Sequence, residues 1–207
     1  NRVLSAGIDV SWRKRAIHFL KRAPKSAVLD SCAGTMDLSR LLRDSFPGDR
    51  IVAADFAPKM LEAGKAKAPS VERVVADAMD LPFKDGEFTK MICGFGMRNV
   101  ADTKKGVAEA RRVLAPGGVF VTLEFFRPTQ LRTQAFHAAY AKVVLPTVGG
   151  LLSGDSGAYK YLAKSMKGFL STAEYMQVLE NSGFESVHSI DLTLGIASVV
   201  VGVVGES

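Results

Sequence analysis

The sequence has little cysteine and no long apolar run, and both shortages narrow the class of protein. Cys32 and Cys93 are its two cysteines in 207 residues, too few for a disulfide-stapled domain, and they favour a reducing compartment. No segment reaches the roughly 18 apolar residues that a membrane-spanning helix needs. The most apolar stretch, 196–204, is rich in β-branched residues and predicts a strand.

The start at Asn1 lacks a basic region followed by a long apolar run, which argues against a signal peptide. It also lacks an initiating Met, so we expect the chain to begin inside a longer natural sequence.

Histidine is scarce as well, and acidic residues are fewer than basic ones. His18, His137 and His188 lie far apart without the spacing of a metal site, so we expect no metal. Lys and Arg total 27 against 21 Asp and Glu, a net charge of +6. That excess is compatible with a nucleic-acid partner, an anionic membrane surface, or solubility alone. Hydrophobic residues at 47% and charged residues at 23% argue against disorder, and the length favours a single domain over 1–207.

Short apolar runs alternate with helix-like segments in the first part of the chain. The runs occupy 27–30, 51–55, 74–77, 90–93 and 119–124. Helices are expected at 38–44, 58–67 and 103–114, and the Pro-Gly-Gly segment 116–118 predicts a turn into the fifth run. Continuous apolar runs are typical of parallel strands buried on both faces. The pattern predicts a doubly wound α/β fold.

The chain changes character after the fifth run. Residues 126–170 show no clear strand and predict a helical insert. Ser171 and Glu174 form a capping-box pattern, which indicates the start of another helix. The β-rich runs 186–192 and 196–204 are separated by a short turn, so they must pair as an antiparallel hairpin.

Three consecutive runs end in an aspartate, namely Asp30, Asp55 and Asp77. In open α/β sheets, ligands bind beyond the carboxyl ends of the strands, and an acid after the second strand can accept hydrogen bonds from ribose hydroxyls. The alternative is that each aspartate caps the helix that follows it. Three acids in succession favour the ligand site over the caps.

The first loop lacks the glycines of a dinucleotide site. It contains Gly34, which permits a tight turn and close backbone approach, but no G-x-G-x-x-G pattern to receive a pyrophosphate. Asp30 and Asp37 would repel a pyrophosphate and suit a cationic ligand. They favour S-adenosylmethionine (SAM), which carries an ammonium group and a cationic sulfur.

These motifs resemble those of class I SAM-dependent methyltransferases, and most closely the ubiquinone/menaquinone biosynthesis C-methyltransferases (the UbiE/MenG family). The matching segments are 28–37, 55–61, 76–83, 95–100, 112–118, 123–125 and 159–165, together with 1–8 and Trp12-Arg13. The resemblance implies an α/β Rossmann-like domain with a mostly parallel seven-stranded sheet and a C-terminal antiparallel hairpin. It implies SAM-dependent C-methylation of a reduced polyprenyl quinone precursor, demethylmenaquinol or a related benzoquinol.

The resemblance also assigns cofactor positions. It implies that Thr35 lies beside the methionine end of SAM, that Asp55 binds the ribose hydroxyls, and that Asp77 and Ala78 flank the adenine. Met60 and Met79 are expected either to pack on the purine or to belong to the core. The expected cofactor-binding residues are Asp30, Gly34, Thr35, Asp55, Phe56, Met60, Asp77, Ala78, Met79 and Gly94.

Two positions depart from the family pattern. Met36 stands where relatives have glycine, so either the loop has ordinary dihedral angles there or cofactor binding is weakened. Gly94 stands where relatives often have a small hydroxyl residue.

Catalytic positions are proposed at the end of the fourth run and in the insert. Arg98 could stabilise a developing phenolate, or it could pair with Asp102 or Glu124 to brace its loop. Asn99 could hydrogen-bond a quinol oxygen. His137 is a candidate base on the insert, which we expect to cover the substrate site. Tyr159 and Tyr161 are candidates to contact the aromatic ring, with a core role as the alternative. Cys32 and Cys93 are expected to be packing residues.

The basic residues gather at the start of the chain. The N-terminal helical region, 1–25, interleaves Lys and Arg with apolar residues, which is typical of a helix on a membrane surface. The alternative is a solvated helix packed on the sheet. We expect a cytoplasmic protein at the inner face of the membrane, with no nucleic-acid partner, and the sequence leaves open whether it forms a homo-oligomer. The competing functions are a methyltransferase for another hydrophobic small molecule and a non-catalytic binding protein of the same fold.

Overall fold

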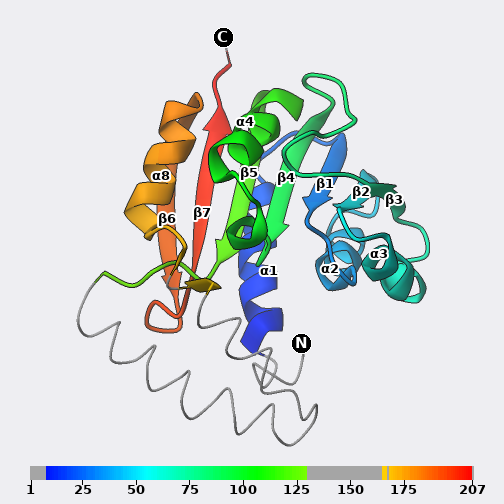
Figure 1. Ribbon diagram of the computed structural model, residues 1–207. Coiled ribbons are helices and arrows are strands. Elements are labelled where there is room, and N and C mark those ends of the chain that lie inside the picture. The colour runs from blue at the N-terminus through cyan, green and yellow to red at the C-terminus, as the bar shows by residue number, and fades with distance from the viewer. Residues whose placement is uncertain (1–7, 130–164, 167, 207) are drawn as a thin grey trace, which may run out of the picture.

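A computed structural model of the chain describes residues 8–129, 165–166 and 168–206. Within them, seven strands form one sheet in the order β3-β2-β1-β4-β5-β7-β6 (Figure 1). The strands are β1 (Ala27–Ser31), β2 (Arg50–Asp55), β3 (Glu72–Val75), β4 (Phe88–Gly94), β5 (Leu114–Glu124), β6 (Phe184–Leu192) and β7 (Ala197–Val204). The described helices are α1 (Ile8–Leu20), α2 (Asp37–Ser45), α3 (Pro58–Gly64), α4 (Thr103–Val113) and α8 (Thr172–Asn181), with short 3₁₀ turns at Lys65–Lys67 and Met97–Asn99.

The strand directions confirm the predicted sheet. Strands β1 to β5 pair in parallel, and β6 and β7 form the expected antiparallel hairpin. Strand β7 also pairs antiparallel with β5, so it lies between β5 and β6 and is the one strand of the seven that runs against the others. The hairpin therefore extends the sheet instead of forming a separate unit.

Among the strand boundaries that differ from the sequence prediction, those of β3 and β5 have consequences for the site and for a predicted turn. Strand β3 ends at Val75, so Asp77 lies beyond it in a loop. Strand β5 begins at Leu114, and the turn predicted at 116–118 is wrong: this segment bulges within the strand. The pairing with β4 steps from Phe88–Leu114 to Lys90–Val119, and Gly117 takes up a positive φ of 71°, a conformation that glycine adopts at low cost.

Helices cover both faces of the sheet, and successive residues of each strand contribute in turn to two separate hydrophobic cores. On one face, α1 and α2 pack over inward-pointing residues such as Val28 and Ile92. On the other face, α4 and α8 pack over neighbours such as Leu29 and Met91. Figure 1 shows α4 and α8 in front of the strands and α1 behind them. Both faces of the central strands are thus removed from water, as the continuous apolar runs predict, whereas the edge strands β3 and β6 are only partly buried.

Helix α8 begins as the sequence predicts. Ser171 accepts the backbone N–H of Glu174, and the Glu174 side chain accepts the backbone N–H of Ser171, which confirms the capping box. One turn later, the fully buried Tyr175 shares a hydrogen bond of 2.8 Å with Thr122 of β5. Because the phenol is paired, its burial leaves no polar group unsatisfied, and α8 is fixed to the sheet.

The apolar side of α1 packs on the sheet. Trp12, Ile17 and Leu20 are buried against β4 and β5, and Trp12 Nε1 donates a 2.8 Å hydrogen bond to Thr193 Oγ1 in the β6–β7 turn. The alternative of a helix packed on the sheet is therefore confirmed, and these apolar residues are not available to a membrane surface. Its basic residues Lys14, Arg15, Lys21, Arg22 and Lys25 are exposed. None of the helices in the described ranges is both long and apolar enough to cross a membrane.

A buried ion pair lies at the amino ends of the strands. Lys90, at the start of β4, places Nζ 2.8 Å from Asp49 Oδ2, and both side chains are almost fully buried. The same ammonium donates a hydrogen bond to the carbonyl of Pro24. With these acceptors, a cation that burial would otherwise disfavour is kept paired.

Candidate active site

A cavity of about 710 Å³ opens at the carboxyl ends of the parallel strands, a volume typical of small-molecule sites. Its walls come from α1 and from the loops that follow β1 to β5. It lies where the strand order reverses between β1 and β4, the position at which open α/β sheets bind ligands. The lining residues that carry the argument below are Asp9, Arg13, Gly34, Thr35, Asp55, Phe56, Met60, Asp77, Ala78, Met79, Gly94, Arg98 and Asn99.

The loop after β1 is tied to the end of β2 through Asp55. Asp55 Oδ2 accepts the N–H of Gly34 at 2.8 Å, and Oδ1 accepts the N–H of Ala57 at 2.8 Å. Gly34 has a φ of 54°, so the conformational freedom predicted for it is used. Each carboxylate oxygen has a second lone pair, so Asp55 retains the capacity to accept hydrogen bonds from a ligand.

Met36 occupies the left-handed region with φ 61° and ψ 25°. Of the two alternatives that the sequence left open here, this excludes ordinary dihedral angles at position 36. Its side chain is fully buried in the core beneath the loop and lies against Gly64, where an added Cβ would be 2.7 Å from Met36 Cγ. The side chain thus points into the core and leaves the cavity wall to its neighbours.

Asp30 lies beneath the cavity and does not line it. Its carboxyl group is 1% exposed and accepts a 2.5 Å hydrogen bond from Ser39 Oγ, while Oδ1 has no partner among the described residues. Burial disfavours the ionised form and raises the pKa of Asp30 to about 7. The structure therefore separates Asp30 from the other predicted cofactor residues. Neither Asp30 nor Asp55 caps a helix, because the N-cap positions of α2 and α3 are Met36 and Ala57.

Asp37 is paired at the mouth of the loop. It accepts hydrogen bonds of 3.0 Å from Thr35 Oγ1 and 3.0 Å from Lys67 Nζ. Burial opposes ionisation of Asp37, but the hydrogen bonds from Lys67 and Thr35 outweigh it and lower the pKa of this carboxyl. Asp37 is therefore ionised and already neutralised by Lys67, so its charge is less available to a cationic ligand than the sequence suggests.

The loop after β3 supplies the far wall of the cavity. Asp77, Ala78 and Met79 line it, and Asp77 Oδ1 accepts the N–H of Met79 at 2.9 Å. Phe56, directly after β2, and Met60, in the first turn of α3, also line the cavity, and Phe56 is 77% exposed. An exposed ring and a thioether beside a cavity are apolar surface that a flat ligand can cover.

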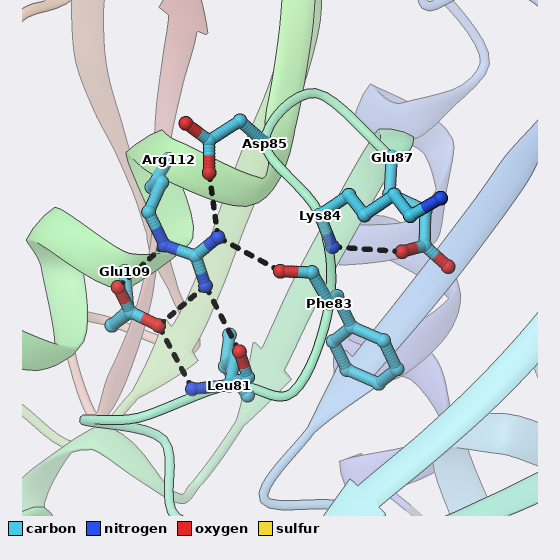
Figure 2. A network of polar contacts seen from close by, with 7 residues as sticks. All are labelled: Leu81, Phe83, Lys84, Asp85, Glu87, Glu109 and Arg112. Atoms are coloured by element: carbon cyan, nitrogen blue, oxygen red, sulfur yellow. Dashed lines mark hydrogen bonds and ion pairs between the residues drawn. The ribbon is translucent and has the colours of Figure 1, made fainter.

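Arg112 holds this loop in place from α4. Its Nη2 donates to the carbonyl of Leu81 at 2.9 Å and its Nη1 to the carbonyl of Phe83 at 2.8 Å. Glu109 pairs with Arg112 and accepts the N–H of Leu81 at 2.8 Å. Figure 2 shows the guanidinium at the centre of this network, with Asp85 on its other side. The loop that carries Asp77 is thus fixed by a planar donor group that matches two carbonyls at once.

Arg98 forms an ion pair with Glu124, one of the two acids that the sequence offered as its partner. Arg98 Nη1 lies 2.5 Å from Glu124 Oε1 and donates to the carbonyl of Phe95 at 2.7 Å. Asp102 instead caps α4, where it accepts the N–H groups of Lys104 and Lys105. Glu124 is fully buried, which raises its pKa, and the charge of Arg98 opposes that rise. Arg98 also lines the cavity, so bracing and a role toward a ligand coexist.

Helix α1 contributes residues to the cavity that sequence reasoning did not assign. Asp9, Trp12 and Arg13 line it, and the Arg13 guanidinium lies 5.6 Å above the centre of the Phe95 ring. In the sequence, Arg13 belongs to the basic N-terminal region, yet its side chain is only 10% exposed. Helical periodicity offered the one available signal, since Arg13 shares a helix face with Asp9, Ile17 and Leu20.

The remaining candidates divide between the described and the undescribed parts. His137, Tyr159 and Tyr161 lie outside the described residues. Cys93 is buried as expected, whereas Cys32 is half-buried and lines the cavity. Across the described ranges, no group of three or more His, Cys, Asp or Glu side chains could hold a metal ion.

Comparison with known proteins gives consistent matches along the whole chain. The model of the ubiE/COQ5 methyltransferase family matches residues 1–204. A relative from Thermus thermophilus named demethylmenaquinone methyltransferase is 42% identical, covering 98% of this chain and 93% of the relative. A relative from Geotalea daltonii named ubiquinone/menaquinone biosynthesis C-methyltransferase UbiE is 40% identical, covering 98% and 88%.

Solved structures share the fold at low sequence identity. The putative methyltransferase in a complex with the Haloferax volcanii Trm112 activator has a TM-score of 0.69 at 20% identity, covering 98% of this chain and 96% of the other. Geranyl diphosphate C-methyltransferase from Streptomyces coelicolor, solved with S-adenosyl-L-homocysteine, has a TM-score of 0.69 at 14% identity, covering 94% and 80%.

Proposed function

Because the chain belongs to the ubiE/COQ5 methyltransferase family and is a SAM-dependent C-methyltransferase, we propose that it methylates a ring carbon of a reduced polyprenyl quinone precursor. Its relatives are named for demethylmenaquinone methylation and for ubiquinone and menaquinone biosynthesis. The observation that carries the proposal is the cavity at the strand ends, which joins carboxylate acceptors on one side to Arg98 on the other. Demethylmenaquinol or a related benzoquinol is the substrate class.

The residues of the cavity fit SAM. Asp55 has lone pairs for the ribose hydroxyls, and the Oδ2 atom of Asp77 has no hydrogen-bond partner among the described residues and suits the exocyclic amine of adenine. Met60 and Met79 offer polarisable surface to the purine ring, beside Phe56. Thr35 and Gly94 lie toward the methionine end in this arrangement. Asp30 is left with a supporting role beneath the loop.

Arg98 is the residue that we assign to the methyl acceptor. When bound, SAM supplies an electrophilic methyl group on a cationic sulfur. The quinol ring becomes a carbon nucleophile as the adjacent hydroxyl is deprotonated or strongly polarised. A fixed guanidinium stabilises the negative charge that develops on the oxygen. Glu124 holds Arg98 in one orientation, and the Nε of Arg98 is buried without a partner in the described part of the chain. Asn99, next to it on the cavity wall, can hydrogen-bond the second quinol oxygen.

A methyl-transfer assay with purified protein, SAM and a short-chain demethylmenaquinol tests the function directly. We expect a singly methylated product by mass spectrometry. If neither demethylmenaquinol nor the related benzoquinol is methylated, the proposal is refuted. Arg98→Ala should lower kcat by roughly 10²–10³ while the SAM dissociation constant stays within a few-fold. The control is Arg111→Ala, since Arg111 bonds Gly183 away from the cavity. An unchanged kcat would remove Arg98 from the reaction.

A membrane-surface contact is part of the proposal, because a polyprenyl substrate resides in the bilayer. The exposed basic residues of the first helix, Lys14 and Arg15 among them, support electrostatic attachment, each contributing about 1 kcal/mol near an anionic surface. Charge reversal at Lys14 and Arg15 should weaken sedimentation with anionic liposomes. Equal sedimentation of the variant would count against contact through α1.

A further inference from the structure

Arg13 is a buried cation whose Nε has no acceptor among the residues that the structure describes. Its side chain is 10% exposed and lines the cavity from α1. Its Nε lies 3.4 Å from Asp9 Oδ2 without hydrogen-bond geometry, and this buried atom has no hydrogen-bond partner among the described residues. By contrast, Arg98 in the same cavity donates to both Phe95 and Glu124.

A guanidinium in this state is matched to an anion that enters the cavity. It carries five N–H donors in a planar fork, which pairs bidentately with a carboxylate. A buried donor without an acceptor is unfavourable, and the Nε of Arg13 is such a donor even though the Asp9 carboxylate lies 3.4 Å away. The Phe95 ring beneath Arg13 restricts its orientation. The ligand that satisfies Arg13 is therefore a planar anion held above Phe95.

The position of Arg13 in the sheet identifies which part of the ligand it meets. Asp77 and Asp55 follow β3 and β2 at one end of the cavity, and α1 packs on β4 and β5 at the other. A SAM molecule with its adenosine on the β2–β3 side therefore extends its amino-acid part toward α1. That part carries the molecule's one carboxylate.

We propose that Arg13 binds the α-carboxylate of the methionine moiety of SAM. The inference rests on SAM as cofactor and is independent of which methyl acceptor is used. It makes Arg13 a residue that distinguishes ligands with the amino-acid part from adenosine thioethers without it. Arg98 then remains the guanidinium for the acceptor, so the two arginines of the cavity serve opposite partners.

Calorimetric titration with two product-like ligands tests the proposal without any methyl acceptor. S-Adenosylhomocysteine carries the carboxylate, whereas 5′-methylthioadenosine has the same adenosine and thioether without it. Arg13→Met should weaken S-adenosylhomocysteine binding roughly 10- to 100-fold, as expected for charge-assisted hydrogen bonds, and leave methylthioadenosine binding within about two-fold. Arg13→Lys should give a smaller loss, since it keeps the charge without the fork.

The matched control is Arg15→Met, on the exposed side of the same helix, which should bind both ligands as the unmodified protein does. If Arg13→Met does not fold, a decarboxylated S-adenosylhomocysteine tested on the unmodified protein replaces it and should bind roughly 10- to 100-fold more weakly than its parent. Equal losses for both ligands, or no loss for S-adenosylhomocysteine, would overturn the assignment. So would a decarboxylated analogue that binds as well as its parent, or a variant that changes only the KM of the quinol.

Discussion

Met36 offers the sharpest test of how this chain tolerates a large side chain at a left-handed backbone position that favours glycine. Its backbone is left-handed and its side chain fills the core against Gly64. Two opposing terms are therefore present at one residue, namely backbone strain and buried packing. Replacement by glycine removes both, whereas replacement by alanine removes the packing and keeps the strain.

The two terms can be given magnitudes. Truncation of a buried methionine to alanine costs about 2–5 kcal/mol, so Met36→Ala should lose that amount. A left-handed conformation costs a residue with a Cβ about 1–2 kcal/mol, and glycine avoids this. Met36→Gly should therefore lose about 1–2 kcal/mol less than Met36→Ala. For a chain of this length each kcal/mol corresponds to about 2–4 °C in Tm, so the two variants should be separated by a few degrees.

Differential scanning calorimetry of the unmodified protein, Met36→Gly and Met36→Ala measures this order. We expect Tm to fall from the unmodified protein to the glycine variant and again to the alanine variant. Met36→Leu, which keeps the volume, should stay close to the unmodified protein. Because the side chain of Met36 points away from the cavity, the SAM dissociation constant should stay within a few-fold in Met36→Gly. A glycine variant more stable than the unmodified protein, or an alanine variant more stable than the glycine variant, would refute the reasoning.

Three further predictions concern the stability of the fold and the loop after β3 that carries Asp77. Lys90→Met should destabilise the protein by about 3–5 kcal/mol in denaturant unfolding because Asp49 is left buried and unpaired, and adding Asp49→Leu should restore most of the loss; no recovery would show that the pair is not the cause. Asp30 has a raised native pKa, so the native state holds its proton between about pH 4 and 7, and stability should fall with rising pH across that window by at most about 4 kcal/mol. Asp30→Asn should flatten that part of the pH profile, and an unchanged slope would assign it to other groups. Arg112→Met should weaken S-adenosylhomocysteine binding several-fold in calorimetry because it loosens the loop that carries Asp77, and unchanged affinity would contradict this.

Local patterns in the sequence were sufficient for most of the architecture. Each apolar run is a strand because both faces of a central parallel strand are covered by helices, and the Ser171–Glu174 pair marks a helix start through contacts only three residues apart. The rule that ligands lie beyond the carboxyl ends of strands also placed Gly34, Asp55 and Asp77 around one cavity. These conclusions depend on interactions within a few residues or on the general geometry of the fold.

Strand boundaries and bulges were harder to predict from the sequence, because they depend on how a strand pairs with its neighbour. The Pro-Gly-Gly segment at 116–118 has the composition of a turn, yet Gly117 lets it bulge while the flanking residues pair with β4. The same limit applies to α1. Its mixture of basic and apolar residues fits a membrane surface or a packed helix equally well, and only the sheet beneath Trp12 shows that its apolar residues are buried.

Periodicity, turn residues and motifs are short-range signals, and they were sufficient to predict the elements, the sheet type, the cavity-forming loops and the family. Which charges meet depends instead on contacts between residues far apart in the chain. Asp30 and Asp55 look equivalent as strand-end acids, but one is buried under Ser39 and the other bridges two loops at the cavity. Arg13, from the basic cluster with which the chain begins, is placed inside the cavity above Phe95. Partners this far apart in sequence are set by the packing of α1 on the sheet, where burial, not composition, fixes the role of a charge.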